Sequence, residues 1–221
     1  MTMESKPVQA DYFSDVLCVW AYVNEVRLKE VRDHFGEQVA IRYGFMPNFS
    51  ATHGKIEQAW QAKGGFDGYA DHVREVADGF GAQLHDGVWR SVRPASSMMA
   101  HSMIKAVAEI ANEYEEMRFI SAVRQAFFQR GEDIATLDVL KALLAEQNLP
   151  MNAILEYWES GQAMAKMYED FQRAQHYQIT VSPAWVFNEG RQRLIGNVGY
   201  RVVEGNLKEL LNSEPLPQVW C

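Results

Sequence analysis

The chain has 221 residues, of which 48% are hydrophobic and 23% are charged, and its formal net charge is −8. This composition predicts a globular protein with an ordinary core, long enough for one domain that carries an insertion. The negative charge, with no basic run to offset it, argues against nucleic acid as a partner. No segment reaches the ~20 apolar residues of a membrane-spanning helix, and residues 1–7 lack the apolar stretch of a secretory signal. We therefore expect a cytoplasmic protein with no membrane partner.

The first part of the chain predicts a βαβ unit. Residues 8–13 and 39–45 are rich in strand-forming side chains, and residues 19–34 place apolar side chains at helical spacing. Gly36 follows the expected end of this helix. Two strands joined by one helix normally lie parallel in one sheet, so we expect a parallel pair at the start of the fold.

A long helical region follows, from about residue 55 to residue 175, and strand signals are almost absent from it. The expected helices cover residues 68–80, 96–111, 117–129, 137–146, 152–158 and 162–176. Strand character returns at residues 184–187 and 193–195, on either side of an Asn-Glu-Gly turn sequence. A last helix is expected at residues 200–211.

Cys18 stands at the junction between the first strand and the first helix. The free backbone N–H groups and the dipole of a helix start favour negative charge, and the thiolate is the nucleophilic form of cysteine. The sequence therefore predicts a lowered thiol pKa and a nucleophilic Cys18. The alternative is that Cys18 is a small buried hydrophobic residue. Asp15, three positions earlier, is expected to be a solvated carboxylate unless it tunes this pKa.

Residues 18–21, Cys-Val-Trp-Ala, resemble the Cys-Pro-Trp-Cys motif of the DsbA-like branch of the thioredoxin superfamily. Three later stretches also resemble that family and occur in its order: residues 94–101, 127–134 and 179–187. The resemblance implies an α/β thioredoxin-like fold (βαβ…ββα) with a large all-helical insertion. It divides the chain into an N-terminal βαβ part (8–54), a helical insertion subdomain (55–176), a C-terminal ββα part (177–212) and an extended tail (213–221).

The same resemblance places Pro183 opposite Cys18. In this superfamily the proline before the third strand follows a cis peptide bond, which is essentially a proline phenomenon. Ser182 would then offer its backbone groups to an extended peptide. The alternative is an ordinary trans proline that opens an edge strand.

Ala21 stands where the family motif has its second cysteine. Cys18 can form a mixed disulfide but cannot close a disulfide with Ala21, so release requires an outside thiol such as glutathione. The only other cysteine, Cys221, is interpreted as a terminal residue on a proline-containing tail. Val19 replaces the usual proline, whereas Trp20 keeps the aromatic side chain of the motif and is expected to be partly exposed beside the thiol.

A related cytoplasmic branch uses glutathione: the 2-hydroxychromene-2-carboxylate isomerases and the kappa-class glutathione transferases. Those proteins carry serine at the position of Cys18 and grip glutathione with a Gly-Ser-Asp-Arg stretch before the last helix. The matching stretch here, residues 196–199, reads Gly-Asn-Val-Gly and lacks the acidic partner of the glutathione amino group. The candidate glutathione-binding residues are therefore Ser182, Asn197, Val198 and Gly199. The alternative is a strand-to-helix turn that needs its glycines for conformational reasons.

These observations favour an enzyme, a thiol–disulfide oxidoreductase with the single nucleophile Cys18 and glutathione as a co-substrate rather than a tightly bound cofactor. Two alternatives stay open: a glutathione-dependent isomerase or transferase, and a redox-inactive binding protein that keeps the fold. The expected partners are small or peptide thiols, disulfides or electrophiles, and a homodimer is left open. The six histidines lack metal-site spacing, so no metal is predicted and each histidine is expected on the surface or in the core.

Overall fold

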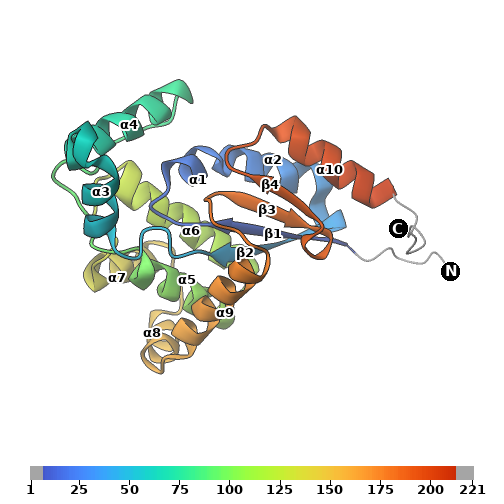
Figure 1. The fold of residues 1–221 in the computed structure, drawn as a ribbon. Helices are drawn as coiled ribbons and strands as arrows, with labels where there is room; N and C mark the ends of the chain where they lie inside the picture. Colours follow the sequence, from blue (N-terminus) through green and yellow to red (C-terminus); the bar gives the residue numbers. More distant parts are fainter. Residues whose placement is uncertain (1–6, 213–221) are drawn as a thin grey trace.

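The computed structural model describes residues 7–212, so the predicted tail and Cys221 lie outside the described residues. One sheet forms the centre, made of β1 (Val8–Ser14), β2 (Val39–Phe45), β3 (Ala184–Phe187) and β4 (Gln192–Ile195). The α-helices of this part of the chain surround the sheet (Figure 1): α1 (Val19–Val23), α2 (Glu25–Phe35), α3 (Thr52–Trp60), α4 (Gly65–Gly79), α5 (Met98–Ile110), α6 (Glu113–Phe128), α7 (Leu137–Glu146), α8 (Met151–Glu159), α9 (Gln162–His176) and α10 (Tyr200–Asn212).

The strand order in the sheet is β2–β1–β3–β4. β1 pairs in parallel with β2 along its whole length, from Val8 opposite Val39 to Ser14 opposite Phe45. β3 is antiparallel to both of its neighbours, β1 and β4. The predicted parallel βαβ pair and the predicted antiparallel hairpin after the helical region are both confirmed.

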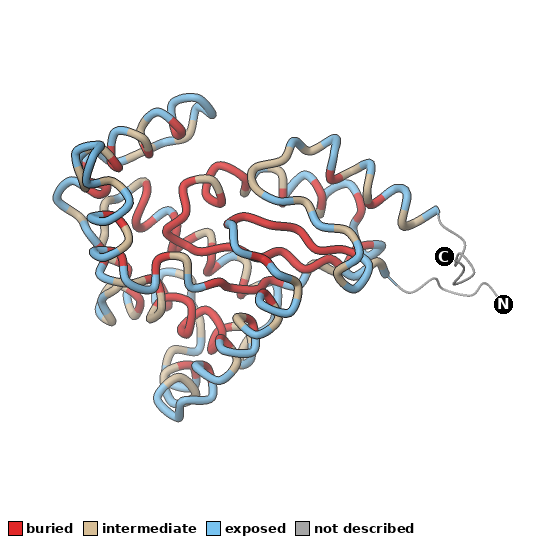
Figure 2. The backbone as a smooth tube through the Cα atoms, in the orientation of Figure 1, coloured by how far each residue is buried: buried red, intermediate tan, exposed pale blue. Residues whose placement is uncertain are grey.

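The two central strands are buried on both faces, and Figure 2 shows them almost wholly in red. Neighbouring side chains along a strand point to opposite faces of the sheet. Phe13 therefore packs on one side, with Ala174 of α9. Tyr12 and Trp185 belong to the larger core on the other side, together with Leu207 of α10. This double burial explains why every residue of β3 is apolar.

The helices between β2 and β3 gather on one side of the molecule, at the left and below the sheet in Figure 1. The sequence predicted most of them but missed α3. That helix buries only Thr52 and Ile56 and contains Gly54, so its apolar periodicity is weak. The division of the chain into four parts stays a prediction.

The single helix predicted for residues 19–34 is in fact two helices, because the chain turns at Asn24. The Asn24 side chain is used elsewhere: its Nδ2 donates to the Tyr12 hydroxyl at 3.0 Å, and its Oδ1 accepts from Arg27 Nη1 at 3.0 Å. The break leaves α1 only five residues long. A helix this short presents little dipole to the thiol at its start.

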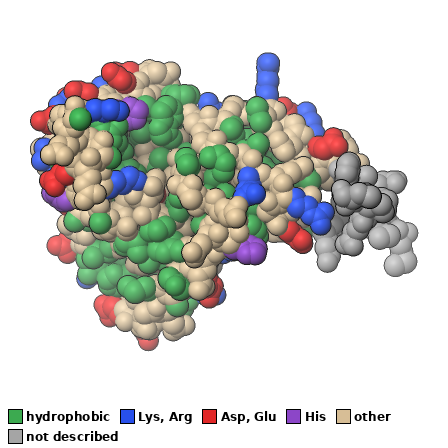
Figure 3. Space-filling model, in the orientation of Figure 1, with side chains coloured by type: hydrophobic (Ala, Val, Ile, Leu, Met, Phe, Trp, Pro, Cys, Tyr) green, Lys and Arg blue, Asp and Glu red, His purple; other side chains and the backbone are tan. Residues whose placement is uncertain are grey.

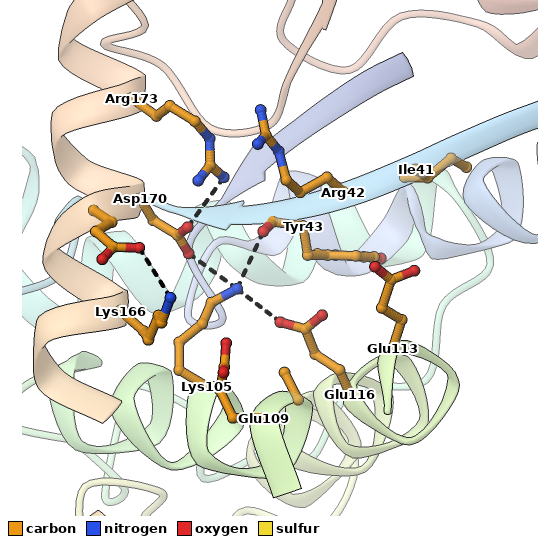
Figure 4. Close-up of a pocket in the computed structure, with 12 residues that line it drawn as sticks. Ile41, Arg42, Tyr43, Lys105, Glu109, Glu113, Glu116, Lys166, Asp170 and Arg173 are labelled. Carbon is orange, nitrogen blue, oxygen red and sulfur yellow. Dashed lines mark hydrogen bonds and ion pairs between the residues drawn. The ribbon is translucent and has the colours of Figure 1, made fainter. Parts of the chain in front are cut away.

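A buried ion cluster fastens the helical region to the edge strand β2. Lys105 Nζ lies 2.7 Å from Glu116 Oε1 and 3.1 Å from Asp170 Oδ2, and it donates to the Tyr43 carbonyl oxygen at 3.1 Å. Asp170 Oδ2 also accepts the backbone N–H of Phe45 at 3.1 Å. Figure 4 shows Lys105, Glu116 and Asp170 converging on β2 from three helices. The cluster gives hydrogen-bond partners to an edge that would otherwise be open.

Candidate active site

Cys18 sits at the end of a tight turn that follows β1. The Cys18 backbone N–H donates to the Asp15 carbonyl at 3.1 Å, and the Cys18 carbonyl accepts the Tyr22 N–H at 3.0 Å as α1 begins. Cys18 is the N-cap residue of α1, in an extended conformation, as the sequence predicted for a strand-to-helix junction. The thiol is buried, with 5% of the residue exposed.

The predicted partner segment lies against this thiol. The peptide bond between Ser182 and Pro183 is cis. Cys18 Sγ donates to the Ser182 carbonyl oxygen at 3.3 Å, and Ser182 Oγ accepts the backbone N–H of Asp15 at 3.1 Å. The turn after β1 and the start of β3 are thus joined by two hydrogen bonds, although they are far apart in sequence.

Ala21 is fully buried one turn further along α1, and Trp20 is half-buried beside it. Within residues 7–212, Cys18 is the one cysteine. The described part of the chain therefore offers a single thiol at this place.

Asp15 is not the solvated carboxylate that the sequence suggested, because it is completely buried beneath the turn. Its Oδ1 accepts the Leu17 backbone N–H at 2.9 Å, and its Oδ2 accepts the Phe49 backbone N–H and the Ser97 hydroxyl, both at 2.8 Å. Burial opposes ionisation, but His101 and the backbone hydrogen bonds outweigh it and hold the pKa of Asp15 below its ordinary value. Asp15 is thus a fixed negative charge that holds the turn in place.

The predicted lowering of the Cys18 pKa was wrong. Burial raises the pKa of the Cys18 thiol, and the nearby Asp15 carboxylate raises it further. The Ser182 side chain and the backbone N–H groups of Trp20 and Ala21 favour the thiolate, but they do not outweigh burial. The sequence indicated that Cys18 lies at a helix start, which lowers a thiol pKa, but it could not show how deeply the sulfur is buried, which raises it.

A pocket of about 310 Å³ opens beside the thiol. That volume is at the lower end of the range for small-molecule sites. Three separate parts of the chain line it, namely the Cys18 turn, the α3–α4 hairpin with the segment before it, and the segment before β3. The lining residues are Cys18, Val19, Trp20, Asn48, Phe49, Lys55, Tyr69, His72, Thr180, Val181 and Ser182.

Lys55 brings a positive charge into this pocket. Its Nζ donates to the Asn48 carbonyl and to Asn48 Oδ1, both at 2.6 Å, and lies 4.3 Å from the centre of the Phe49 ring. Burial lowers the pKa of Lys55, and the charges of Asp15 and Cys18 oppose that shift. The two bonds to Asn48 use two of the three ammonium N–H donors, and Lys55 lines the same pocket as the Cys18 thiol.

An aromatic rim continues outward from the pocket. The Trp20 ring lies 6.2 Å from the His72 ring and 6.2 Å from the Phe80 ring, measured between centroids, and Trp60 lies 5.1 Å from His72. Phe80 is 46% exposed. Figure 3 shows hydrophobic side chains on this face, where the end of α4 approaches α1.

The predicted residues Asn197, Val198 and Gly199 do not line this pocket. The Arg27 guanidinium contacts Asn197 Oδ1 and lies over the Phe80 ring, 5.4 Å from its centre. Through Arg27, the loop thus contacts the aromatic rim, and it does not line the pocket at the Cys18 thiol. A glutathione-binding role for these three residues stays a prediction.

Sequence reasoning missed Lys55, Asn48, Tyr69 and His72. All four come from residues 48–72, where α3 was not predicted and the placement of the hairpin over the thiol depends on tertiary packing. The only local signal of a functional residue was His72, because histidine often carries chemistry, and the sequence predicts it on the surface or in the core. Across residues 7–212, no group of three His, Cys, Asp or Glu side chains is placed to hold a metal ion.

The fold and the site together define a thioredoxin-like protein, with a cysteine at the helix start after the first strand and a cis-proline segment facing it. A family model described as thioredoxin matches residues 12–204, and the chain belongs to the thioredoxin family. None of the helices in residues 7–212 combines the length and the apolar character needed to cross a membrane.

Similar proteins carry several different functional names. The ClpXP adapter protein SpxH of Halalkalibacterium halodurans is 24% identical over 95% of this chain and 70% of its own length. The cytosolic disulfide reductase DsbM of Pseudomonas aeruginosa, also solved with GSH, has a TM-score of 0.70 at 16% identity, covering 92% of this chain and 100% of its own. A 2-hydroxychromene-2-carboxylate isomerase has a TM-score of 0.65 at 18% identity, covering 91% and 95%.

Proposed function

We propose that this protein catalyses thiol–disulfide exchange with Cys18 as its only nucleophile and an external thiol, glutathione, as co-substrate. The observation that carries this proposal is the pairing of Cys18 Sγ with the Ser182 carbonyl at the floor of an open pocket, with Ala21 in the place of a second thiol. A cysteine that opens to a pocket and has no second cysteine beside it suits a two-step exchange, in which an external thiol releases the mixed disulfide.

The reaction conserves sulfur and electrons in each step. The Cys18 thiolate attacks one sulfur of a substrate disulfide R–S–S–R′, so that the Cys18–S–S–R bond forms and R′–S⁻ leaves and takes a proton. Glutathione, as its thiolate, then attacks the R sulfur and releases Cys18. The substrate half R′ is reduced to a thiol, and glutathione is oxidised to a mixed disulfide with R.

The pocket suits a short, negatively charged peptide thiol. Lys55 supplies an ammonium group for a carboxylate. Val181 is 44% exposed next to Ser182, and within the described residues its backbone N–H and C=O make no hydrogen bond. Free backbone groups of this kind can pair with an extended peptide. The neighbouring fold of DsbM, solved with GSH, supports the choice of glutathione.

The test is a coupled assay that follows glutathione-dependent reduction of a small disulfide. We expect Cys18→Ser to lose the activity and Cys221→Ser, the matched control at the other cysteine, to keep it. Equal activity in the Cys18→Ser variant and the unchanged protein would end the proposal. Since the second step needs a supply of free glutathione, we place the reaction in the reducing cytoplasm.

A second candidate is a redox-inactive binding protein, and one observation favours it: burial raises the pKa of Cys18, so little thiolate exists at neutral pH. The SpxH relative, which is named as an adapter, agrees with a binding role. Under this reading Cys18 forms no mixed disulfide with oxidised glutathione. A stable adduct at Cys18 that free glutathione removes would decide for the enzyme.

A further inference from the structure

The second step of the proposed exchange moves a proton as well as an electron pair. An external thiol has an ordinary pKa of about 8.5 and is mostly protonated at neutral pH. The leaving group is Cys18, and a thiol with a raised pKa leaves slowly unless it is protonated as it departs. A group that takes the proton from the incoming thiol and returns it to Cys18 would assist both events.

Four lining residues carry groups that can exchange a proton: Cys18, Lys55, Tyr69 and His72. Lys55 is held as a donor by both oxygens of Asn48 and has no free lone pair as an ammonium. Burial raises the pKa of Tyr69 beyond any working pH, so this phenol stays protonated. His72 is therefore the candidate acid–base group of the lining.

His72 projects from α4, which packs against α1 beside the thiol. The ring is half-buried between the Trp20 and Trp60 rings. Among residues 7–212, nothing hydrogen-bonds to its two nitrogens, so one of them is a free acceptor whenever the ring is neutral. Cys18 and His72 line the same cavity from different elements, and a co-substrate between them would contact both.

We propose that His72 is the general acid–base group that accepts the proton of the external thiol and delivers it to the Cys18 sulfur as the mixed disulfide is resolved. This inference rests on the proposed function. The thiol G–SH gives its proton to the His72 ring and becomes G–S⁻. That thiolate attacks the R sulfur of Cys18–S–S–R, the G–S–S–R bond forms, and Cys18–S⁻ takes the proton from the ring. Protons and electrons balance without a further reactant.

The charges around the ring suit this role. Burial lowers the pKa of His72, Lys63 lowers it further and Glu75 opposes them, so the ring is a neutral acceptor at pH 7. From the other elements of the pocket, Lys55 and Cys18 face the same cavity. A ring that is neutral at rest can take up the proton of the incoming thiol.

The experiment is a single-turnover resolution assay in the Cys221→Ser background. The glutathione mixed disulfide of Cys18 is formed with oxidised glutathione and isolated, and 2-mercaptoethanol then releases it while intact mass is followed from pH 5 to pH 9. The neutral reagent removes any contribution from charge pairing with Lys55. The variants are His72→Gln and His72→Ala, and His53→Gln is the matched control, an exposed histidine of α3 that does not line the pocket.

We expect His72→Gln to slow release about 10²-fold at pH 7 and to lose the part of the pH profile that titrates below the ordinary histidine pKa of about 6.5. Free imidazole should restore release in His72→Ala, and His53→Gln should match the unchanged protein. An unaltered rate in His72→Gln overturns the inference and leaves the proposed function intact. A uniform loss of rate at every pH, without imidazole rescue, also overturns it, because that pattern is expected when the substitution only disturbs side-chain packing. If the unchanged protein forms no mixed disulfide, the proposed function fails and the inference fails with it.

Discussion

Two pockets formed by residues 7–212, one of about 390 Å³ around Lys105 and one of about 310 Å³ around Cys18, use their polar groups differently. In the Lys105 pocket the buried ammonium has three acceptors within 3.1 Å, so each of its protons has a partner. In the Cys18 pocket the His72 ring nitrogens and the Val181 backbone have no hydrogen-bond partner within the described residues.

This difference separates a structural cluster from a site for chemistry. The Lys105 cluster joins three helices to one strand, and its ammonium group is fully used in doing so. In the Cys18 pocket the buried Asp15 fixes the turn that carries the proposed nucleophile, and other groups stay free toward the cavity. Substitutions in the first pocket should therefore change stability, and substitutions in the second should change activity.

The largest expected effect is on stability, at Lys105. Burial opposes its charge, but Glu116 and Asp170 outweigh burial and raise the pKa of Lys105. Lys105→Ala would leave the buried Glu116 without its counter-charge and Asp170 with Arg173 as its remaining ion-pair partner. Breaking a buried pair in this way costs about 3–5 kcal/mol in the free energy of unfolding. Urea unfolding measures this change. Lys166→Ala is the control in the same pocket, because its ion pair with Glu169 is largely exposed and should change the free energy of unfolding far less. Equal losses in the two variants would contradict the structural role of the buried Lys105 cluster.

The next effect is on co-substrate binding, at Lys55. Losing a hydrogen bond to a charged partner costs about 1.5–3 kcal/mol, so Lys55→Ala should raise the KM for glutathione by roughly 10-fold or more while the unfolding midpoint changes little. Lys63→Ala, an exposed lysine near the same hairpin, is the control. Steady-state kinetics at several glutathione concentrations measures both variants. An unchanged KM in Lys55→Ala would remove the carboxylate-binding role.

The sequence could predict one part of the Cys18 pocket and not the other. Cys18, Ser182 and Pro183 were predicted to meet because the family resemblance places the proline segment opposite the cysteine. The structure gives the physical reason, since β1 and β3 are neighbours in the sheet. Lys55 and His72 were not predicted there, because their position depends on how the α3–α4 hairpin packs over α1. The sign of the Cys18 pKa shift also depends on burial, which the local pattern does not contain.

A smaller effect concerns pH. The folded pKa of Cys18 lies above its unfolded value, so the unfolded chain loses its thiol proton first as pH rises. Stability should therefore fall as pH rises through the window above the ordinary value of about 8.5. Iodoacetamide alkylation of Cys18 in the Cys221→Ser background should follow the same raised midpoint. A midpoint below the ordinary value would contradict the burial argument and restore the sequence prediction.

The smallest effect is expected at Asn197, which lies outside the Cys18 pocket and contacts its aromatic rim through Arg27. Asn197 contacts Arg27 and does not line the Cys18 pocket. Asn197→Ala should change the free energy of unfolding by about 0.5 kcal/mol or less and leave the KM for glutathione unaltered. Isothermal titration with glutathione checks the binding part. A clear loss of affinity would show that the predicted loop does reach the co-substrate.

The most direct test of the central claim is intact-protein mass spectrometry of the Cys221→Ser variant, treated first with oxidised and then with reduced glutathione. The account predicts that the protein gains the mass of one glutathione, that peptide mapping places it on Cys18, and that reduced glutathione removes it. Cys18→Ser in the same background should gain nothing. A protein that stays unmodified under conditions that modify a free thiol would contradict the account and leave a thioredoxin-fold binding protein.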